Sequence, residues 1–516
     1  MIISHFILIL YNDIIFCKGD ISMNFYPSVV ENIANYAVTR PDTLALADSN
    51  LELTYAELND CINALACTLK AKGIREGDCV TVECNQSVDY IVSEMAIQLI
   101  GGIFVPIEKN AAFSRIEEIV SDTESKLFIG KAPVEGIDID FLKITEASAQ
   151  PHCSFEDLGL DGYPAGNKEC EILFSTGTTG KSKGIVLTNS NNIAIAENIV
   201  NGVEMKDGNV ELIPMPLSHS HGLRTTYANL TMGCTSVFID GVTLLKKVFN
   251  MMDHFKVTSM DLSPSMLSII FKLSKDRIGD YADTLDYIQL GSAPLAEEDK
   301  VHLSRVLPKT RLYNFYGSTE AGRSCCLDFN KSAGKVGCIG KPSVNAHFIV
   351  VDDNRNEIES SRDNLGLLAS SGPINMKCYF KEPELTAETM ANGFIYTKDL
   401  GFIDEEGYVY MLGRKDDVIN YGGIKISPEE IESQVLKSDI VADCACIPVA
   451  DALMGQAPKL YVQLESGAEY DQKSFRTFLA DVLDANKLPK YIELIDAIPR
   501  TSNGKIIRKD LAALNK

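Results

Sequence analysis

A nine-residue segment, STGTTGKSK at residues 175–183, has the composition of a phosphate-binding loop. Its glycines leave backbone N–H groups exposed, its hydroxyl side chains donate hydrogen bonds, and its two lysines supply positive charge. Apolar residues stand before it at 172–174 and after it at 185–187, so we expect a loop between two strands. It does not match the pattern G-x-x-x-x-G-K-[ST], because its glycines are too closely spaced. Taken alone, the same composition also fits a surface turn.

Alternating helices and strands surround this loop and must position it. Residues 53–73 have apolar side chains at helical spacing and end at a glycine, which predicts a helix. Residues 78–84 alternate as a strand does, and residues 89–107 read as a helix, a Gly-Gly break and a second strand. This alternation predicts an α/β fold, with parallel sheets covered by helices on both faces.

The pattern changes in the last third of the chain. From about residue 365 the helical patterns become rare, and residues 393–427 read as short strands joined by Gly and Asp turns. Ser427 is then a good N-cap, followed by Pro428 at the first helical position and Glu430 in the first turn. We therefore expect the last ~100 residues to form a small α+β domain, joined near Gly413.

Length and composition exclude several classes of protein. A chain of 516 residues exceeds what one hydrophobic core usually supports, which predicts at least two domains. The net charge of -23 repels nucleic acid and anionic lipid, so we expect no nucleic-acid partner. The 14 cysteines are scattered without zinc-knuckle spacing, and we expect them to be reduced, mostly buried and free of metal.

The first 22 residues have an unusual composition. The apolar run at 2–16 contains Asp13, is too short for a membrane-spanning helix, and lacks the basic start and cleavage site of a signal peptide. Codons for residues 18–20 can resemble a ribosome-binding site before Met23. We therefore expect residues 1–22 to be a non-native extension of a cytoplasmic protein that has no membrane span.

Six further segments follow the loop in a recognisable order. They are PMPLSHSHGL (214–223), LGSAPL (290–295), YNFYGSTEAG (313–322), YTKDLG (396–401), GRKDDVINYGGIKISPEEIE (413–432) and PRTSNGKIIRKDL (499–511). Together with the loop they resemble the adenylate-forming superfamily of acyl-CoA synthetases, peptide-synthetase adenylation domains and luciferases, over residues 26–511. The resemblance implies a large domain at 23–412, built from two α/β sheets and a distorted β-barrel, and a small mobile α+β domain at 413–516.

The resemblance also implies a reaction. A carboxylic acid attacks the α-phosphorus of ATP to give acyl-AMP and pyrophosphate, and the acyl group then passes to the thiol of coenzyme A. Because the first step joins two anions, the site must neutralise charge and align the reactants. Lys505 matches the family's catalytic lysine, which bridges the carboxylate and the α-phosphate. Glu320 matches the Mg²⁺ ligand, a role that suits a carboxylate beside phosphates.

The nucleotide site is implied residue by residue. The β- and γ-phosphates would lie on Ser175, Thr176, Gly177, Thr178, Thr179, Gly180 and Lys183. Adenine would be framed by Ser292, Ala293, Pro294, Asn314 and Gly317, with Tyr316 stacked on the base and Thr319 on the α-phosphate. Asp399 would bind both ribose hydroxyls with help from Arg414. The chain departs from the family at Ser182, where Pro is usual, and at Lys398, where Gly is usual.

The acyl pocket and the thiol site are implied in less detail. His219 occupies the position at the mouth of the acyl pocket, and His221 could point into it. The alternative for each is a buried histidine that is merely packed. The small domain would turn about Asp416 and present Gly422 and Gly423 to the thiol. Lys425 stands where Arg is usual, which keeps the charge and loses the bidentate geometry.

The identity of the acid stays open at this point. No Asp stands near residues 214–223 to pair with an α-ammonium group, which argues against a standard amino acid. The HSHGLR stretch resembles oxalate- and malonate-type CoA ligases, and Arg224 or Arg323 could pair with a second carboxylate. Fatty and aromatic acids fit equally well.

Two other functions are weighed against a CoA ligase. A stand-alone adenylation enzyme would load the phosphopantetheine thiol of a carrier protein in trans. A non-catalytic nucleotide-binding regulator is a second alternative, and the presence of Glu320, Asp399, Arg414 and Lys505 argues against it.

Overall fold

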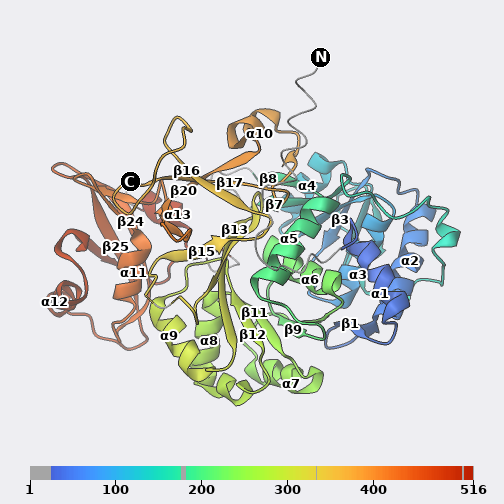
Figure 1. Ribbon diagram of the computed structural model, residues 1–516, viewed down its shortest axis with the longest axis horizontal. Helices are drawn as coiled ribbons and strands as arrows, with labels where there is room; N and C mark the ends of the chain where they lie inside the picture. Colours follow the sequence, from blue (N-terminus) through green and yellow to red (C-terminus); the bar gives the residue numbers. More distant parts are fainter. Residues whose placement is uncertain (1–24, 176–181, 333, 502–504, 515–516) are drawn as a thin grey trace.

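The computed structural model describes residues 25–175, 182–332, 334–501 and 505–514, so the expected extension at 1–22 and the start at Met23 lie outside them (Figure 1). Strands gather into three sheets of seven, 14 and five strands. The two larger sheets belong to residues before 415 and the smallest to residues after it. The expected α/β fold with a large first domain and a smaller second one is confirmed.

The seven-stranded sheet holds the predicted phosphate loop at one of its hairpins. Five strands run parallel in the order β7-β4-β3-β5-β6, and β8 and β18 complete the sheet in antiparallel fashion. The bounds are β3 (Cys79–Glu83), β4 (Ile103–Ile107), β5 (Leu127–Gly130), β6 (Asp140–Lys143), β7 (Glu169–Ser175), β8 (Lys183–Thr188) and β18 (Cys378–Tyr379).

Two expected helices are present, α3 against β3 and β4 of this sheet and α2 against α3. The helix predicted at 53–73 is α2 (Tyr55–Ala71), which starts with a capping box between Thr54 and Glu57. Gly73 follows it with φ +90°, a conformation that favours glycine. The helix predicted after residue 89 is α3 (Val88–Leu99), followed by β4 as expected.

The 14-stranded sheet begins as a parallel sheet and continues as an antiparallel one. Its parallel strands are β10 (Thr235–Phe238), β9 (Val210–Ile213), β11 (Ser259–Leu262), β12 (Tyr287–Leu290) and β13 (Arg311–Ser318), with β1 (Leu44–Ala47) and β2 (Glu52–Thr54) at the edge. The part expected as a distorted barrel consists of β14 (Gly322–Asp328), β15 (Cys338–Pro342), β16 (His347–Val351), β17 (Gly366–Ser371), β20 (Phe394–Ile403) and β21 (Val409–Arg414), with β19 (Met390–Ala391) beside β20. These strands run on from β13 without a break in pairing.

The largest apolar core lies between the two large sheets. It joins residues of both sheets to α3, α5 (Asn189–Gly202) and α6 (Ser220–Met232). A second core covers the far face of the 14-stranded sheet with α7 (Leu245–Phe255), α8 (Pro264–Ser274) and α9 (Glu297–Val306). The carboxyl ends of β9, β11, β12 and β13 therefore lie next to the start of α6, where a ligand site is expected in an α/β fold.

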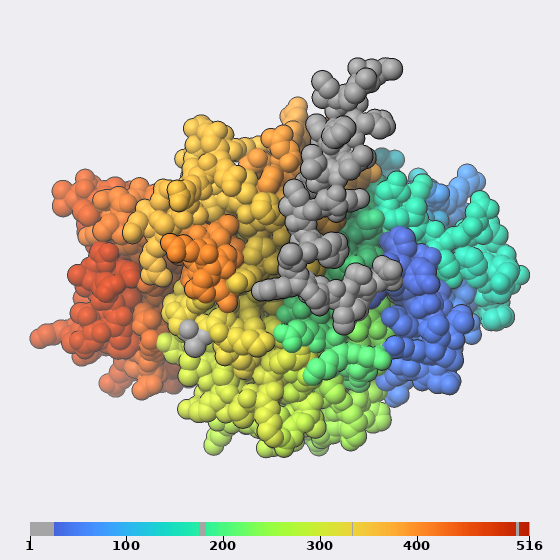
Figure 2. All heavy atoms as spheres, in the orientation of Figure 1, coloured from blue at the N-terminus to red at the C-terminus, as the bar shows by residue number. Residues whose placement is uncertain are grey.

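The chain after Arg414 forms a separate α+β unit. It contains β22 (Ile419–Tyr421), β23 (Ile424–Ile426), α11 (Pro428–Val435), β24 (Val441–Asp451), β25 (Gly455–Leu464), α12 (Gln472–Val482), β26 (Tyr491–Leu494) and α13 (Arg508–Ala513). Ser427 caps α11 by accepting a hydrogen bond from the Glu430 amide, as predicted. In Figure 2 this unit (red) abuts the large domain on one side. The ion pairs Lys272–Glu465 and Lys437–Glu298 cross the junction.

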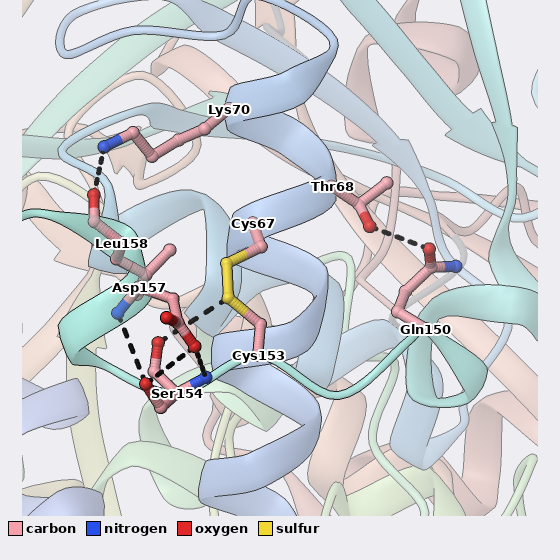
Figure 3. Close-up of a disulfide and its surroundings, with 8 residues drawn as sticks. All are labelled: Cys67, Thr68, Lys70, Gln150, Cys153, Ser154, Asp157 and Leu158. Carbon is pink, nitrogen blue, oxygen red and sulfur yellow. Dashed lines mark hydrogen bonds between the residues drawn. A yellow bond between two sulfur atoms is a disulfide. The ribbon is translucent and has the colours of Figure 1, made fainter.

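The prediction that the cysteines are reduced is wrong for one pair. Cys67 in α2 and Cys153 form a disulfide that closes an 86-residue separation (Figure 3). Hydrogen bonds on either side tie the same segments together, from Thr68 to Gln150 and from Lys70 to the Leu158 carbonyl. The spacing of two cysteines so far apart does not indicate that they pair. The pairing results from the packing of α2 against residues 144–158.

Among the described residues no helix is long and apolar enough to cross a membrane.

We expect the Cys67–Cys153 disulfide to stabilise the first part of the chain. Closing a loop of this length restricts the unfolded chain, and its loss destabilises by on the order of 2–4 kcal/mol. Adding a phosphine reductant should lower the unfolding midpoint of the wild type and leave that of Cys67→Ser unchanged. A thiol titration of the denatured protein should find two fewer thiols before reduction than after it, and equal counts would contradict the bond.

Candidate active site at the domain junction

Lys505 lies across the domain junction from three predicted site residues. It belongs to the small domain, yet its charge interacts with Asp399 and Glu320 of the large domain and with Arg414 at the junction. Desolvation lowers the pKa of Lys505; Arg414 also lowers it, while Asp399 and Glu320 raise it. The side chain still reaches solvent. Desolvation makes a charged ammonium group less stable unless an anion lies beside it. Lys505 is therefore suited to bind an anionic ligand at this junction.

Asp399 and Tyr316 are joined by their side chains, although β20 and β13 are not adjacent in the strand order of the sheet. The Tyr316 hydroxyl of β13 donates a hydrogen bond to Asp399 Oδ2 on β20. Burial, and then the charge of Asp399, raise the pKa of Tyr316 well above its usual range, so the phenol stays protonated. Asp399 is also the register partner of Arg414 on β21. The contact holds the Tyr316 ring beside the Asp399 carboxylate. This arrangement suits the expected roles, in which Tyr316 stacks on adenine and Asp399 binds the ribose of the same nucleotide.

Glu320 is connected to the phosphate loop through Tyr379, a residue that the sequence did not single out. The Tyr379 hydroxyl donates to Glu320 Oε1 at 3.0 Å, and the Lys183 ammonium lies 5.5 Å from the centre of the Tyr379 ring. Burial, and then Glu320, raise the pKa of Tyr379. No motif predicts this role, because it arises when β18 pairs with β8.

A magnesium ion fits this arrangement with few protein ligands. Glu320 offers a hard carboxylate oxygen near the loop, and Mg²⁺ usually takes one or two carboxylates together with phosphates and water. Within the described parts of the chain no three His, Cys, Asp or Glu side chains gather as a metal cluster. A single carboxylate fits an ion that would be delivered with a nucleotide, and Glu320 would be its protein ligand.

The described part of the loop is its base. Ser175 and Lys183 face each other as the last pair of the β7–β8 hairpin. Arg115 donates a hydrogen bond to the Ser182 hydroxyl, the position where the sequence departs from the family. The other predicted phosphate ligands, Thr176, Gly177, Thr178, Thr179 and Gly180, lie outside the described residues.

The two histidines at the start of α6 differ in their surroundings. His221 is buried and held on both sides, with Nδ1 2.7 Å from Ser292 Oγ and Nε2 2.7 Å from Asp261 Oδ1. His219 is the N-cap residue of α6, and burial lowers its pKa, which favours the neutral ring. The structure therefore places His219 at the helix start and gives His221 the contacts of a positioning residue.

The predicted adenine segments meet at the ends of β12 and β13. Asn314 donates to the Leu290 carbonyl at 3.0 Å, which joins the two strands, and Ser292 follows with φ +71°, a strained conformation for a residue with a Cβ. The Ser220 hydroxyl lies 3.3 Å from that of Thr319. Ala293, Pro294 and Gly317 lie in these same two segments. The structure thus brings the adenine, α-phosphate and acyl-pocket candidates to one place.

The residues expected to serve the thiol lie elsewhere. Gly422 and Gly423 form the exposed turn between β22 and β23, with φ +59° and +95°, and Lys425 is exposed on β23. Asp416 lies in the turn between β21 and β22, just after Arg414. Among the described residues, no hydrogen bond or ion pair joins these four residues to Glu320, Asp399 or Lys505. The structure thus places Lys505, and not the β22–β23 turn, close to Glu320 and Asp399.

Buried polar side chains hold α6 on the sheet below this site. Glu211 on β9 accepts hydrogen bonds from Asn229, Tyr287 and Gln289 at 2.6–2.9 Å. Asp261 on β11 binds His221 and, at 2.8 Å, accepts from Thr225. Desolvation, and then the nearby charge of Asp261, raise the pKa of Glu211 to about 7. No motif marks Glu211, Asp261 or Gln289. Side chains alternate between the two faces of a strand, and these three lie on the faces of β9, β11 and β12 that are turned toward α6.

Comparisons with known proteins agree with this geometry. Residues 33–380 match the family model for AMP-binding enzyme, and residues 430–505 match that for AMP-binding enzyme C-terminal domain. The chain is 27% identical to a 2-succinylbenzoate--CoA ligase of Geobacillus sp. (strain WCH70), over 94% of this chain and 98% of the relative. It is 26% identical to the probable CoA ligase CCL5 of Humulus lupulus, over 91% and 89%.

Solved structures show the same fold. ATP-bound MatB from Rhodopseudomonas palustris superposes with a TM-score of 0.84 at 24% identity, covering 94% of this chain and 99% of that one. The anthranilate CoA ligase AuaEII, in complex with anthranoyl-AMP, gives 0.84 at 21% identity, over 96% and 98%.

The raised pKa of Glu211 predicts a pH-dependent stability. Its folded pKa of about 7 exceeds the ordinary value of 4.5, so between these values the native state keeps a proton that the unfolded chain releases. The stability from this site is therefore present below about pH 4.5 and declines as pH rises to about 7. We expect Glu211→Gln to raise the unfolding midpoint relative to wild type increasingly across that window, and by a constant amount above it.

The matched control is Glu117→Gln, since Glu117 is an exposed carboxylate on α4 (Phe113–Thr123). The difference in unfolding midpoint between Glu117→Gln and wild type should not vary across the same pH range. If the Glu211→Gln difference also stayed flat, the buried carboxylate would not titrate in that window.

Proposed function

The chain belongs to the AMP-binding enzymes, and from this premise we propose that it is an acid–CoA ligase that acts through an acyl-adenylate. A carboxylic acid and ATP would give acyl-AMP and pyrophosphate, and the acyl group would then pass to the thiol of CoA. The names of the relatives as CoA ligases support CoA as the acceptor. ATP and adenylate ligands in structures of the same fold support the first step.

The position of Lys505 is the observation that carries the proposal. Adenylation brings an acid carboxylate to the α-phosphate, so a positive charge is needed between the two anions. Lys505 is the small-domain cation that interacts with both Glu320 and Asp399. In the proposal Asp399 holds the ribose, Tyr316 stacks on adenine, and the Lys505 ammonium binds the carboxylate and α-phosphate oxygens.

We assign the roles of the other candidate site residues from the residues that lie next to them in the structure. Ser175, Lys183 and the loop between them would hold the β- and γ-phosphates, Thr319 the α-phosphate, and Arg414 the ribose beside Asp399. A bound Mg²⁺ would neutralise phosphate charge, and Glu320, held by Tyr379, would be its protein ligand. His219 at the N-cap of α6 would border the reacting carboxylate.

The second step requires another domain arrangement. Gly422, Gly423 and Lys425 lie in the exposed β22–β23 hairpin, away from Lys505. We place the hinge at Asp416, with a large domain at 23–412 and a small one at 413–516. Rotation there would withdraw Lys505 and present the hairpin to the acyl-adenylate, because both belong to the small domain.

The proposal is tested by measuring pyrophosphate release and thioester formation across carboxylic acids of varied length, ring and charge. ATP-dependent pyrophosphate release with at least one acid, and a thioester with CoA, are expected. Adenylate formation followed by transfer only to a carrier protein would replace CoA with that acceptor. Nucleotide binding without pyrophosphate release would indicate a non-catalytic protein.

Removing the Lys505 ammonium should affect one step selectively. We expect Lys505→Ala to lower the rate of adenylate formation by on the order of 10²–10³, as loss of a preorganised charge does. Transfer of the acyl group from pre-made acyl-AMP to CoA should persist. The control is Lys473→Ala, an exposed lysine on α12 of the same domain, which should alter neither step. Unchanged pyrophosphate release in Lys505→Ala would refute the assigned role.

Restricting the backbone at Asp416 should separate the half-reactions. Proline fixes φ near -65° and cannot follow a large rotation, so Asp416→Pro should impair acyl transfer far more than adenylation. Asp416→Ala, which leaves φ free, should retain both. Each step is measured separately, by pyrophosphate release and by transfer from pre-made acyl-AMP. Equal losses in both steps would show that the turn is a rigid junction.

A further inference from the structure

Three polar side chains form a hydrogen-bonded series at the start of α6. His221 Nδ1 lies 2.7 Å from Ser292 Oγ, and His221 Nε2 lies 2.7 Å from Asp261 Oδ1. Ser292 follows β12, His221 belongs to the first turn of α6, and Asp261 lies on β11. A hydroxyl, an imidazole and a carboxylate in series are the parts of a hydrolase triad, which is recognised by geometry and not by fold. The adenylation step proposed above uses neither the Ser292 hydroxyl nor Asp261.

The partners of Asp261 decide which nitrogen of His221 carries the proton. Asp261 has no exposed surface, and its second oxygen accepts a hydrogen bond from the Thr225 hydroxyl at 2.8 Å. An ionised carboxylate only accepts hydrogen bonds, so the Nε2–H group of His221 donates to Asp261. In the neutral ring Nδ1 is then an acceptor, and it receives the O–H of Ser292. His221 is therefore placed as a base toward Ser292, and Asp261 fixes its tautomer.

The backbone holds Ser292 in a sharp turn between β12 and α9. Its φ of +71° is unfavourable for a residue with a Cβ. The turn passes close to the Phe315 ring, and only a glycine fits before Ser292, because a Cβ on Gly291 would come within 2.1 Å of that ring. Ser292 is partly exposed, whereas His221 and Asp261 behind it are buried. A strained serine after a strand, with its hydroxyl within reach of solvent, has the setting of a nucleophile.

The start of α6 offers stabilisation for a negatively charged oxygen beside this serine. The first N–H groups of a helix have no partner within the helix, and its N-terminal end carries partial positive charge. Within the described residues the N-cap His219 makes no capping hydrogen bond with its side chain. In the same turn the Ser220 hydroxyl lies 3.3 Å from that of Thr319, the residue expected at the α-phosphate. His221 thus joins Ser292 to a helix start that suits an oxyanion next to a phosphate.

From this geometry we propose a second activity, the hydrolysis of activated acyl esters, with Ser292 as nucleophile and His221 as general base. The Ser292 Oγ forms a bond to the acyl carbon while its proton passes to His221 Nδ1. The bond from the acyl carbon to the leaving oxygen breaks, and the leaving group departs as an anion. His221 then releases the proton to solvent, which leaves an acyl ester on Ser292.

Water completes the reaction at the same base. The water oxygen forms a bond to the acyl carbon and gives its proton to His221 Nδ1, and the bond to Ser292 Oγ breaks as Oγ takes that proton back. One water is consumed, and no oxidant or reductant is needed. The identity of the ester rests on the proposed function, since acyl-AMP is the activated ester that the enzyme itself would form. Acyl-AMP that does not meet a thiol is then returned as the free acid and AMP.

The test uses the full chain with p-nitrophenyl acetate, without ATP or CoA. Wild type should release p-nitrophenol, and Ser292→Gly should lower the rate by about 10²-fold or more, as loss of a nucleophile with its base does. Glycine suits the φ of this position, so the variant adds no backbone strain. Asp261→Asn should cause a similar loss, because an amide can donate to Nε2 and leave Nδ1 as the donor. Thermal unfolding of each variant reports whether the fold persists.

A fluorophosphonate label gives a second readout, since it reacts with activated serines. Peptide mass spectrometry should find it on Ser292 in wild type and find none in Ser292→Gly. The matched control is Ser268→Ala, which removes an exposed hydroxyl of α8 that bonds only within its own helix and should change neither readout. A label on another residue, or a p-nitrophenol rate that persists in Ser292→Gly, would overturn the inference.

The two proposals fail in different ways. A wild type that releases pyrophosphate from ATP and an acid but does not hydrolyse the ester would overturn this inference alone. Ester hydrolysis that depends on Ser292, without pyrophosphate release for any acid, would overturn the proposed function alone and leave Ser292 as the nucleophile of a hydrolase.

Discussion

The burial of charge against α6 is the constraint on which the rest of this site depends. Four carboxylates with no exposed surface surround that helix: Glu94, Glu171, Glu211 and Asp261. An isolated buried carboxylate is very unfavourable, so each requires a donor, and α6 supplies donors to all four through His221, Arg224, Thr225, Tyr227 and Asn229. Sliding the helix by one turn would break these contacts together. The network thereby fixes the histidines at the helix start relative to the strand ends.

The reacting centre depends on a second constraint, that its charges come from two domains. The large domain contributes the acids Glu320 and Asp399, which suit a metal ion and a sugar, and the small domain contributes the cation Lys505. Among the described residues, the ion pairs Lys272–Glu465 and Lys437–Glu298 that cross the junction are largely exposed, and such pairs are weak. The proposed rotation requires a junction of this kind, because the same centre would receive Lys505 in one step and the Gly422–Gly423 turn in the other.

The sequence predicts the helices, the strands and the candidate site residues more fully than the side chains that contact those residues. Apolar periodicity is local, so α2, β3 and α11 are found close to their predicted bounds, and linear motifs identify Glu320, Asp399 and Lys505. Tyr379 carries no motif and reaches Glu320 only through the pairing of β18 with β8. The Cys67–Cys153 bond depends on packing across 86 positions. Sequence treats Arg224 and Arg323 alike, and only the structure shows that Glu171 neutralises one and not the other.

In the proposed function, the residues for phosphate and ribose are held by backbone pairing, such as Asp399 with Arg414 and Ser175 with Lys183. Their positions would then be the same whichever acid is activated. The interface between α6 and the sheet is held instead by side chains. Replacing Arg323 alone by an apolar residue would remove one donor from each of Gln289 and Thr225, which are buried. The buried polar residues of this interface are therefore coupled, and one of them can be changed at low energy only together with its partners.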